Sequence, residues 1–295
     1  MTPAIEPTQE SVFTIREIAP KIFDMTIVSS TEEGSAALIS KHAKAGQFVM
    51  IRGGEEAERI PLTIAQTEPE KRAVRLIFQV AGTSTHKLSL LKPGDPVLNL
   101  AGPLGKPSEI VEGKKVLVIG GGVGIAAILP IARELYHAGN EVTVVLGART
   151  TALLILKDEF AQISHHLTLC TDDGSEGRKG FVTDAIKDLV AYRGVYDVGW
   201  AVGPTIMMKM CSEIAKQLDF PLWTSLNPIM VDGTGMCGGC RVLVGDEVFF
   251  ACVDGPEFDG RLVDWDNLML RQKQFKNEEA DSYHHCRLED QLNSR

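Results

Sequence analysis

The pattern of apolar and polar residues divides the chain into a strand-rich first third and a middle in which strands alternate with helices. Between Val12 and Leu100 the apolar runs are short and separated by turn residues, most clearly at residues 47–52 and 74–80. In the second run apolar side chains occupy every other position, as in a half-buried strand. No long helical period occurs here. We therefore predict an antiparallel barrel or sandwich over residues 1–107.

The middle of the chain follows a different pattern. Residues 115–124 read KVLVIGGGVG, which predicts a strand buried on both faces, a glycine turn and then a helix that continues to Ala138 and contains Pro130. Helical stretches lie between most of the further strands, which we expect at residues 142–146, 167–170, 195–202 and 222–226. This alternation predicts a doubly wound parallel sheet over residues 108–227.

The third segment, residues 231–256, contains three of the six cysteines and is rich in glycine. Asp232 precedes Cys237 with four residues between them, and Cys240 and Cys252 follow. A cysteine in place of Asp232 would give the C-x4-C-x2-C…C spacing of plant-type [2Fe–2S] ferredoxins. Glycines supply the unusual backbone angles and the bare N–H groups that a cluster loop needs. We predict a [2Fe–2S] domain over residues 228–260, with Asp232, Cys237, Cys240 and Cys252 as ligands.

The cysteine spacing leaves other chemistries open. The same thiolates would suit a zinc site, and C-x2-C also occurs in redox-active thiol pairs. Cys170, Cys211 and Cys286 are available as a fourth ligand, but Asp232 alone lies at the expected offset.

Composition limits the partners and the compartment. The 295 residues suit two or three domains, and the net charge of −9, without a basic block, disfavours nucleic acid and anionic membranes as partners. The first residues lack a secretion signal, and the longest apolar run, 116–132, is interrupted by four glycines and Pro130. Clustered cysteines suggest a reducing compartment. We therefore expect a cytoplasmic protein with no membrane span.

Two short motifs in the first domain suggest phosphate and flavin chemistry. In Arg59-Ile60-Pro61-Leu62-Thr63 the proline favours an extended backbone, so that Arg59 could pair with a phosphate and Thr63 could form a hydrogen bond. The second motif is a predicted helix start whose free N–H groups would bind an anion, made of Gly82, Thr83, Ser84 and Thr85. Taken alone, these motifs also fit a surface arginine and a simple helix cap.

In the middle domain the predicted nucleotide site lies at the carboxyl edge of the sheet. The glycine turn would hold a dinucleotide pyrophosphate through Gly120, Gly121, Gly122 and Gly124, although Ile125 occupies the third position of the strict G-x-G-x-x-G fingerprint. Further contacts are expected at the ends of later strands, from Arg149, Asp172, Asp173, Gly203 and Pro204. The acidic pair, and Asp173 in particular, favours NAD(H) over NADP(H), while Arg149 favours the phosphorylated form.

The order of these motifs resembles known proteins. R-x-P-x-T, G-T-S-T and PGDPVLNLAGPLG resemble the flavin domain of the ferredoxin reductase superfamily, with Pro61-Leu62-Thr63 in place of its usual tyrosine and serine. The whole chain resembles the electron-transfer subunit of dihydroorotate dehydrogenase B. It is more similar to the small (alpha) subunit of NADH-dependent ferredoxin:NADP oxidoreductase, also described as the sulfide dehydrogenase beta subunit. The most specific strings are SLNPIMVDGTGMCGGCRV and FACVDGPEFDG.

The resemblance implies cofactors, partners and contacts. It implies FAD, NAD(H), a [2Fe–2S] cluster with an aspartate ligand, and a larger flavin and iron–sulfur subunit in a heterodimer that reaches ferredoxin indirectly. Relatives often have a cysteine where this chain has Val202, so we assign no catalytic thiol. The implied flavin contacts are Arg59, Pro61, Leu62, Thr63, Gln79, Val80, Gly82, Thr83, Ser84 and Thr85.

The implied function is electron transfer: a hydride passes between NAD(H) and FAD, and single electrons pass through the cluster to or from the partner. The alternatives are a dihydroorotate dehydrogenase B or sulfide dehydrogenase subunit, a stand-alone NADH reductase, and a zinc-stabilised nucleotide-binding regulator. We predict a helical tail over residues 261–295. Its apolar stripe, which includes Trp265 and Leu268, would pack on its own domain or dock the partner.

Overall fold

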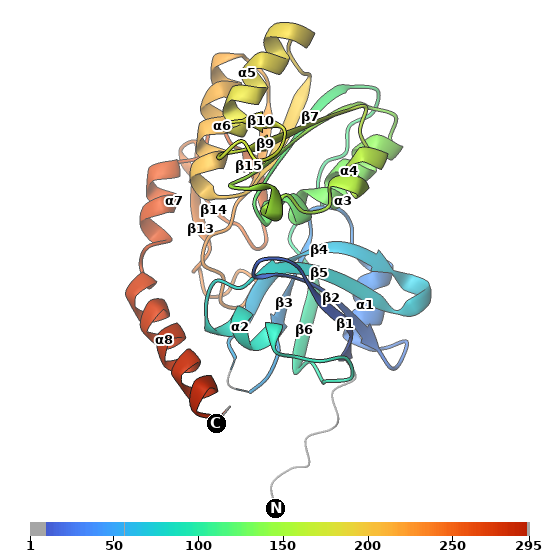
Figure 1. Ribbon diagram of the computed structural model, residues 1–295, viewed down its shortest axis with the longest axis vertical. Helices are drawn as coiled ribbons and strands as arrows, with labels where there is room; N and C mark the ends of the chain where they lie inside the picture. The colour runs from blue at the N-terminus through green and yellow to red at the C-terminus, as the bar shows by residue number, and fades with distance from the viewer. Residues whose placement is uncertain (1–9, 56, 294–295) are drawn as a thin grey trace, which may run out of the picture.

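The computed structural model describes residues 10–55 and 57–293, which form a lower barrel, an upper nucleotide domain and a strap of C-terminal helices along one side (Figure 1). The predicted absence of a secretion signal rests on residues 1–13, of which residues 1–9 lie outside the described residues. Among the described residues, none of the helices combines the length and the apolarity that crossing a membrane requires.

The barrel confirms the antiparallel prediction. Its strands are ordered β1-β2-β5-β4-β3-β6, and a bridge between Ser11 and Pro96 joins β1 to the segment before β6 and closes the sheet. Helix α1 (Ser35–His42), η1 (Pro69–Lys71) and α2 (Thr83–Ser89) lie in the connections. The strands are β1 (Glu10–Ala19), β2 (Ile22–Ser29), β3 (Phe48–Arg52), β4 (Ile60–Glu68), β5 (Ala73–Gln79) and β6 (Asn99–Leu104).

The nucleotide domain has the predicted doubly wound sheet, in the order β10-β9-β8-β7-β11-β12-β15. All pairs are parallel except β12 with β15 (Glu257–Asp259). The strands are β7 (Lys115–Gly121), β8 (Glu141–Ala148), β9 (His166–Thr171), β10 (Arg178–Lys179), β11 (Val198–Val202) and β12 (Leu222–Ser225). The helices are α3 (Gly124–His137), η2 (Thr151–Leu153), α4 (Lys157–Gln162), α5 (Val182–Arg193) and α6 (Thr205–Gln217).

The cysteine-rich segment does not stand apart as a separate body. The hairpin β13 (Arg241–Val244) and β14 (Glu247–Phe250) follows the loop, but β15 (Glu257–Asp259) pairs with β12 and extends the nucleotide sheet. Side chains from all three parts share one core, among them Phe48 of the barrel, Met208 of α6 and Cys240 of the loop. The segment therefore fills the corner where the barrel meets the nucleotide sheet.

The tail forms two helices with different environments. Helix α7 (Trp265–Arg271) packs with Trp265 and Leu268 buried, as the apolar stripe predicts for packing on its own domain. Helix α8 (Lys276–Asn293) continues as a strap down the side of the molecule towards α2 (Figure 1).

Polar contacts reinforce the apolar interface between the two large domains. Arg75 on β5 donates to both oxygens of Asp24 on β2, at 2.9 and 3.0 Å, and to both oxygens of Glu159 on α4, each at 3.1 Å. On another side of the interface, Ser108 of the interdomain connection donates to Glu257 Oε1 at 2.6 Å. Burial raises the pKa of the Glu257 carboxyl to about 7. Both contacts fix the orientation of the domains around the space between them.

Candidate cofactor and cluster sites

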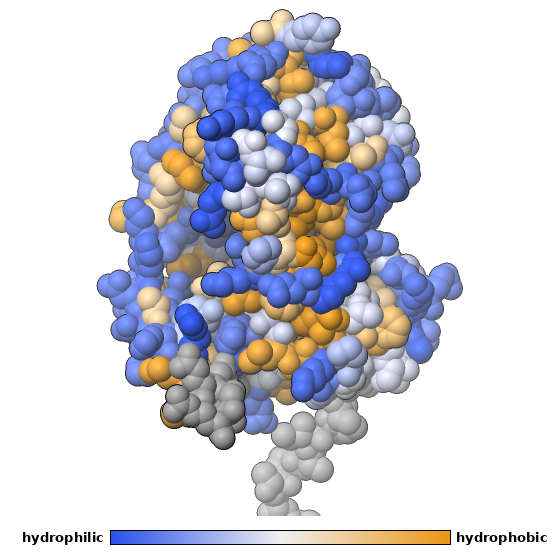
Figure 2. Space-filling model, in the orientation of Figure 1, coloured by the Kyte–Doolittle hydropathy of each residue, from blue (hydrophilic) through white to orange (hydrophobic). Residues whose placement is uncertain are grey.

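A cavity of about 970 Å³ lies between the barrel and the nucleotide domain. Apolar side chains gather in the recess between the upper and lower halves of the molecule (Figure 2). Both domains contribute walls, so neither could form the cavity alone. A volume of this size, lined mainly by apolar groups with a few polar ones, is typical of a cofactor or substrate site.

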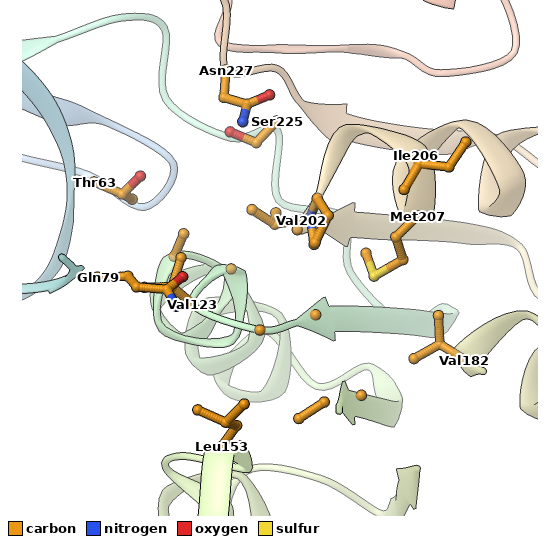
Figure 3. Close-up of a pocket in the computed structure, with 18 of the residues that line it drawn as sticks. Thr63, Gln79, Val123, Leu153, Val182, Val202, Ile206, Met207, Ser225 and Asn227 are labelled. Carbon is orange, nitrogen blue, oxygen red and sulfur yellow. The ribbon is translucent and has the colours of Figure 1, made fainter. Parts of the chain in front are cut away.

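The barrel wall of the cavity consists of adjacent strand ends. Pro61, Leu62 and Thr63 come from β4, and Gln79 comes from the end of β5. Thr63 and Gln79 point into the cavity from the barrel side, opposite Val123 and Val202 (Figure 3). This wall therefore presents one hydroxyl and one amide on an otherwise apolar surface, a pattern that suits a flat ring system with polar edges.

The opposite wall is the glycine turn and its neighbour in the sheet. Gly121, Gly122 and Gly124 line the cavity together with Gly203 and Pro204. β7 and β11 lie side by side, and the order of the strands reverses at this point, where open α/β sheets bind ligands.

At two of these positions the backbone conformation or the close packing requires glycine. Gly122 has φ of +55°, a left-handed conformation that other residues rarely adopt, and a Cβ on Gly124 would lie 2.5 Å from the Val202 carbonyl oxygen. The chain can therefore turn at Gly122 and enter α3 close to β11.

Of the two acidic residues predicted to favour NAD(H) over NADP(H), one faces the cavity and the other does not. Asp172 and Arg149 line the cavity beyond the glycine turn. Asp173 lies outside the lining, and its Oδ1 accepts hydrogen bonds from Ser175 N at 2.9 Å and from Ser175 Oγ at 2.7 Å. The Ser175 hydroxyl and N–H hold the pKa of Asp173 below its ordinary value. Asp172 is thus better placed than Asp173 to contact a ribose.

Other predicted contacts lie outside the lining of the main cavity. Gly120 lies within β7, where a Cβ would crowd Ile125, and Val80 lines a second, smaller cavity. The remaining residues are the exposed Arg59 at the start of β4 and, at α2, Gly82, Thr83, Ser84 and Thr85. These two segments do approach each other, because Glu58 N donates to Ser84 Oγ at 3.3 Å.

The hydroxyls of α2 are already engaged. Thr85 Oγ1 accepts from the N–H groups of Ala81 and Gly82, at 2.9 and 3.1 Å, and so caps its own helix. The hydroxyls of Thr83 and Ser282 are hydrogen bonded at 3.0 Å.

Sequence motifs missed much of the lining. The unpredicted residues are mostly apolar and carry no local signature; they include Phe48, Leu153, Phe181, Val182, Ile206, Met207, Leu226 and Met230. Ser225 and Asn227, which point into the cavity in Figure 3, end and follow the last parallel strand, and that position was the one signal that could have identified them.

The cysteine-rich loop has the predicted backbone. Gly233, Gly235 and Gly238 have φ values of +80°, +86° and +65°, which only glycine adopts readily. Gly239 N–H points at Cys237 Sγ, at 3.4 Å. The loop therefore provides left-handed turns and an N–H group directed at sulfur, as expected for a loop that wraps an iron–sulfur cluster.

The four predicted ligands are brought to this loop but not to one point. Cys240 and Cys252 are buried with their Sγ atoms 3.3 Å apart, whereas Cys237 is exposed. Asp232 accepts hydrogen bonds from Thr234 N and Cys237 N, each at 2.7 Å. Within the described part of the chain, no three His, Cys, Asp or Glu side chains are gathered as a preformed metal site.

The donor set nevertheless fits an iron–sulfur cluster. Three thiols and one carboxylate are available within a glycine-rich loop, and thiolates are the ligands that such clusters require. Burial raises the pKa of the Cys252 thiol to about 12, so a bound metal must displace its proton.

The loop and the cavity are neighbours. A Cβ on Gly233 would lie 2.6 Å from Met50 of β3, and Met50 pairs with Pro61 of β4. Phe48, also on β3, lines the cavity and belongs to the core that contains Cys240 and Cys252. One strand thus separates the barrel wall of the cavity from the cysteine loop.

Comparisons with known proteins identify both halves of this arrangement. Residues 118–213 match a family described as "Oxidoreductase NAD-binding domain". Residues 227–264 match the "Iron-sulfur cluster binding domain of dihydroorotate dehydrogenase B". A Desulforamulus reducens electron transfer subunit of dihydroorotate dehydrogenase B (NAD(+)) is 34% identical, over 86% of this chain and 97% of its own. The chain belongs to the dihydroorotate dehydrogenase B electron-transfer subunit family.

Two further proteins share half or more of their aligned residues with this chain. A Thermotoga maritima protein named as a homolog of the dihydroorotate dehydrogenase B (NAD(+)) electron transfer subunit is 54% identical, over 90% of this chain and 92% of its own. A solved structure concerned with flavin-based electron bifurcation in NADH-dependent reduced ferredoxin-NADP oxidoreductase has a TM-score of 0.85 and 50% identity, over 96% of this chain and 99% of the other.

Family and fold together support FAD, NAD(H) and a [2Fe–2S] cluster as the cofactors of this electron-transfer subunit.

Proposed function

We propose that this chain exchanges a hydride between NAD(H) and FAD and passes electrons through a [2Fe–2S] cluster to or from a larger flavin and iron–sulfur subunit. The observation that carries the proposal is the cavity built by both domains, with the cysteine loop directly behind its barrel wall. FAD, when bound, converts between two-electron and one-electron transfer, and the cluster conducts single electrons.

The residues of the chain supply position and shielding. Thr63 and Gln79 would hold the polar edge of the flavin ring, and the glycine turn with Gly203 would place the nicotinamide against it. Hydride transfer depends on close alignment more than on acid–base groups, so Val202 in place of a cysteine leaves the reaction possible. Met207 and Leu226 extend the apolar lining, which limits the access of water.

For the cluster, the proposed ligands remain Asp232, Cys237, Cys240 and Cys252. Arg59 and residues 82–85 are proposed to hold the flavin phosphates, because Arg59 and Ser84 belong to segments that meet at Glu58. We also propose a cytoplasmic location, supported by the free cysteines and the cluster chemistry.

Among the family members, the ferredoxin:NADP oxidoreductase type of complex is favoured over dihydroorotate dehydrogenase B itself. The solved structure of that type shares 50% identity over almost the whole chain. The Desulforamulus reducens dihydroorotate dehydrogenase B subunit shares 34%. Asp232, where dihydroorotate-type subunits are expected to carry cysteine, supports the same choice.

The function and its nucleotide preference are tested together by stopped-flow reduction of the flavin. We expect NADH to bleach the flavin far faster than NADPH, because Asp172 accepts the ribose hydroxyls and repels a 2′-phosphate. Asp172→Ala should lower the NADH-to-NADPH ratio of kcat/KM about ten-fold, as expected for loss of a charged hydrogen bond.

Asp173→Ala is the matched control, because its carboxylate is occupied by Ser175. Its ratio should change less than about three-fold. Absence of flavin reduction by either nucleotide would contradict the function, whereas a larger effect at Asp173 than at Asp172 would contradict only the assignment of the ribose contact.

A further inference from the structure

A second cavity, of about 320 Å³, lies between the barrel and helix α8. Phe23 lies near the start of β2, Val80 directly follows β5, His86 comes from α2, and Tyr283 and Arg287 come from α8. Its volume falls near the lower limit of small-molecule sites. Nothing in the electron-transfer scheme above accounts for this cavity or for the helix that closes it.

Helix α8 touches the protein at this cavity. Among its side chains that the structure describes, Cys286 is the one that is buried and Tyr283 the one that is half-buried; the others are exposed. Tyr283, Cys286 and Arg287 lie on one face, because residues three and four apart are neighbours on a helix. The contacts to α2 include the Thr83–Ser282 hydrogen bond and the edge-on packing of the Tyr283 and His86 rings, 5.7 Å between centroids.

Apolar burial does not explain why this polar helix lies here. Most of the stability of a helix in a protein comes from tertiary packing, and among the α8 side chains that the structure describes Cys286 is the buried one. A ligand between α8 and the barrel would add contacts to this helix. The position of the helix over the cavity is thus a reason to expect an occupant.

The lining indicates the chemistry of the occupant. Phe23, His86 and Tyr283 provide aromatic surfaces on which a flat base could stack. Lys21 and Arg287 bring positive charge, and Glu17 and Ser89 bring hydrogen-bonding oxygens. Aromatic rings beside cationic side chains suit a nucleoside attached to phosphate.

The second cavity borders the same segment as the first. Gln79 and Ala81 line the main cavity, and Val80 between them lines the second. A ligand long enough to pass around the end of β5 could therefore occupy both. FAD has a flavin at one end and an adenosine joined through a pyrophosphate at the other, whereas the proposed NAD(H) site extends away towards Asp172.

We propose that the second cavity binds the adenosine end of FAD, with Tyr283 stacked on the base and Arg287 near the phosphate that belongs to the adenosine half, and that α8 closes over it. The inference rests on the proposed flavin function, which it deepens by assigning to the C-terminal helix the discrimination of FAD from FMN. The tail that the sequence leaves without a definite role thereby becomes part of the cofactor site.

The test compares FAD with FMN, which lacks the adenosine. Apoprotein of the full chain is titrated with each flavin, and Kd is measured from the quenching of flavin fluorescence. For the wild type we expect tighter binding of FAD than of FMN. Tyr283→Ala and Arg287→Met should each weaken FAD binding about ten-fold or more and leave the FMN Kd within two-fold.

His285→Ala is the matched control, because His285 is exposed on the opposite face of α8 and should change neither Kd. In a second measurement, FAD but not FMN should protect α8 from trypsin. Equal Kd values for FAD and FMN in the wild type, or equal weakening of both in the variants, would overturn this inference and leave the proposed function intact. A wild-type chain that binds no flavin would overturn both.

Discussion

Cys240→Ser is expected to remove the iron–sulfur cluster while leaving the flavin in place. The Cys240 and Cys252 sulfurs are buried 3.3 Å apart, and both are proposed ligands of the cluster. Cys240→Ser therefore removes one of the two buried thiolates. A serine hydroxyl is a hard, weakly acidic donor that replaces a thiolate poorly on iron. Because even outer-shell changes weaken metal sites by 10–100-fold, we expect the iron content to fall below about a tenth of the wild-type value.

The measurement is iron and flavin content per chain after anaerobic purification. Cys170→Ala is the control: Cys170 is also buried, but it lies on β9 in the nucleotide sheet. Flavin reduction by NADH should persist in Cys240→Ser, since the cavity does not include Cys240. Full iron content in Cys240→Ser, or equal losses in it and in the Cys170→Ala control, would contradict the ligand assignment.

Arg75→Met is expected to destabilise the protein by about 3 kcal/mol, because it leaves the buried Asp24 carboxylate with only the exposed Arg16 as a charged partner. The Arg75 side chain is 15% exposed, and that of Asp24 is 7% exposed. Burial opposes the charged form of Asp24, and the hydrogen bonds from Arg75 and Arg16 outweigh it, so the pKa of Asp24 is lowered. At 2–4 °C per kcal/mol, the midpoint of thermal unfolding should fall by about 6–12 °C.

Arg16→Met is the matched control on the same carboxylate. Its side chain is 71% exposed, and exposed ion pairs contribute less than about 1 kcal/mol. The two variants thus separate a buried interdomain contact from a surface one. Equal shifts in both, measured by circular dichroism at pH 7, would contradict the view that Arg75 joins the two domains.

The same pair predicts a pH dependence. An aspartate with a lowered native pKa stabilises the fold above the unfolded pKa of about 4, and this contribution is lost as the pH falls through the native value. In Arg75→Met the pKa of Asp24 should rise, because burial raises it and the hydrogen bond from Arg75, which lowers it most, is lost. The difference between wild type and Arg75→Met should therefore shrink as the pH is lowered from 7 through about 4 towards the native pKa of Asp24.

The sequence was most informative where chemistry depends on local spacing. Cys237 and Cys240 are three positions apart, and the glycine turn follows a buried strand, so both sites could be predicted without knowledge of the tertiary fold. The alternation of side chains over residues 74–80 likewise predicted a strand, and β5 covers most of this segment. In each case the pattern lies within one short segment and requires particular residue types.

The rest of the cavity lining and of the strand pairing depends on contacts between segments that are distant in the sequence. Met207 and Leu226 are ordinary apolar residues, and only the packing of α6 and β12 beside the glycine turn brings them into the cavity. Asp172 and Asp173 are adjacent and identical in type, so the sequence alone does not distinguish them. In the structure Asp173 accepts hydrogen bonds from the Ser175 N–H and hydroxyl. The pairing of β15 with β12 likewise shows no local signal, since three residues are too few for a periodic pattern.

The central claim is that one chain holds a flavin beside an iron–sulfur cluster and receives electrons from NADH. The most direct test is the absorption and EPR spectrum of the anaerobically purified full chain before and after NADH. We expect about one FAD and two irons per chain, bleaching of the flavin bands, and the EPR signal of a reduced [2Fe–2S] cluster. A colourless protein with stoichiometric zinc and no response to NADH would contradict the account.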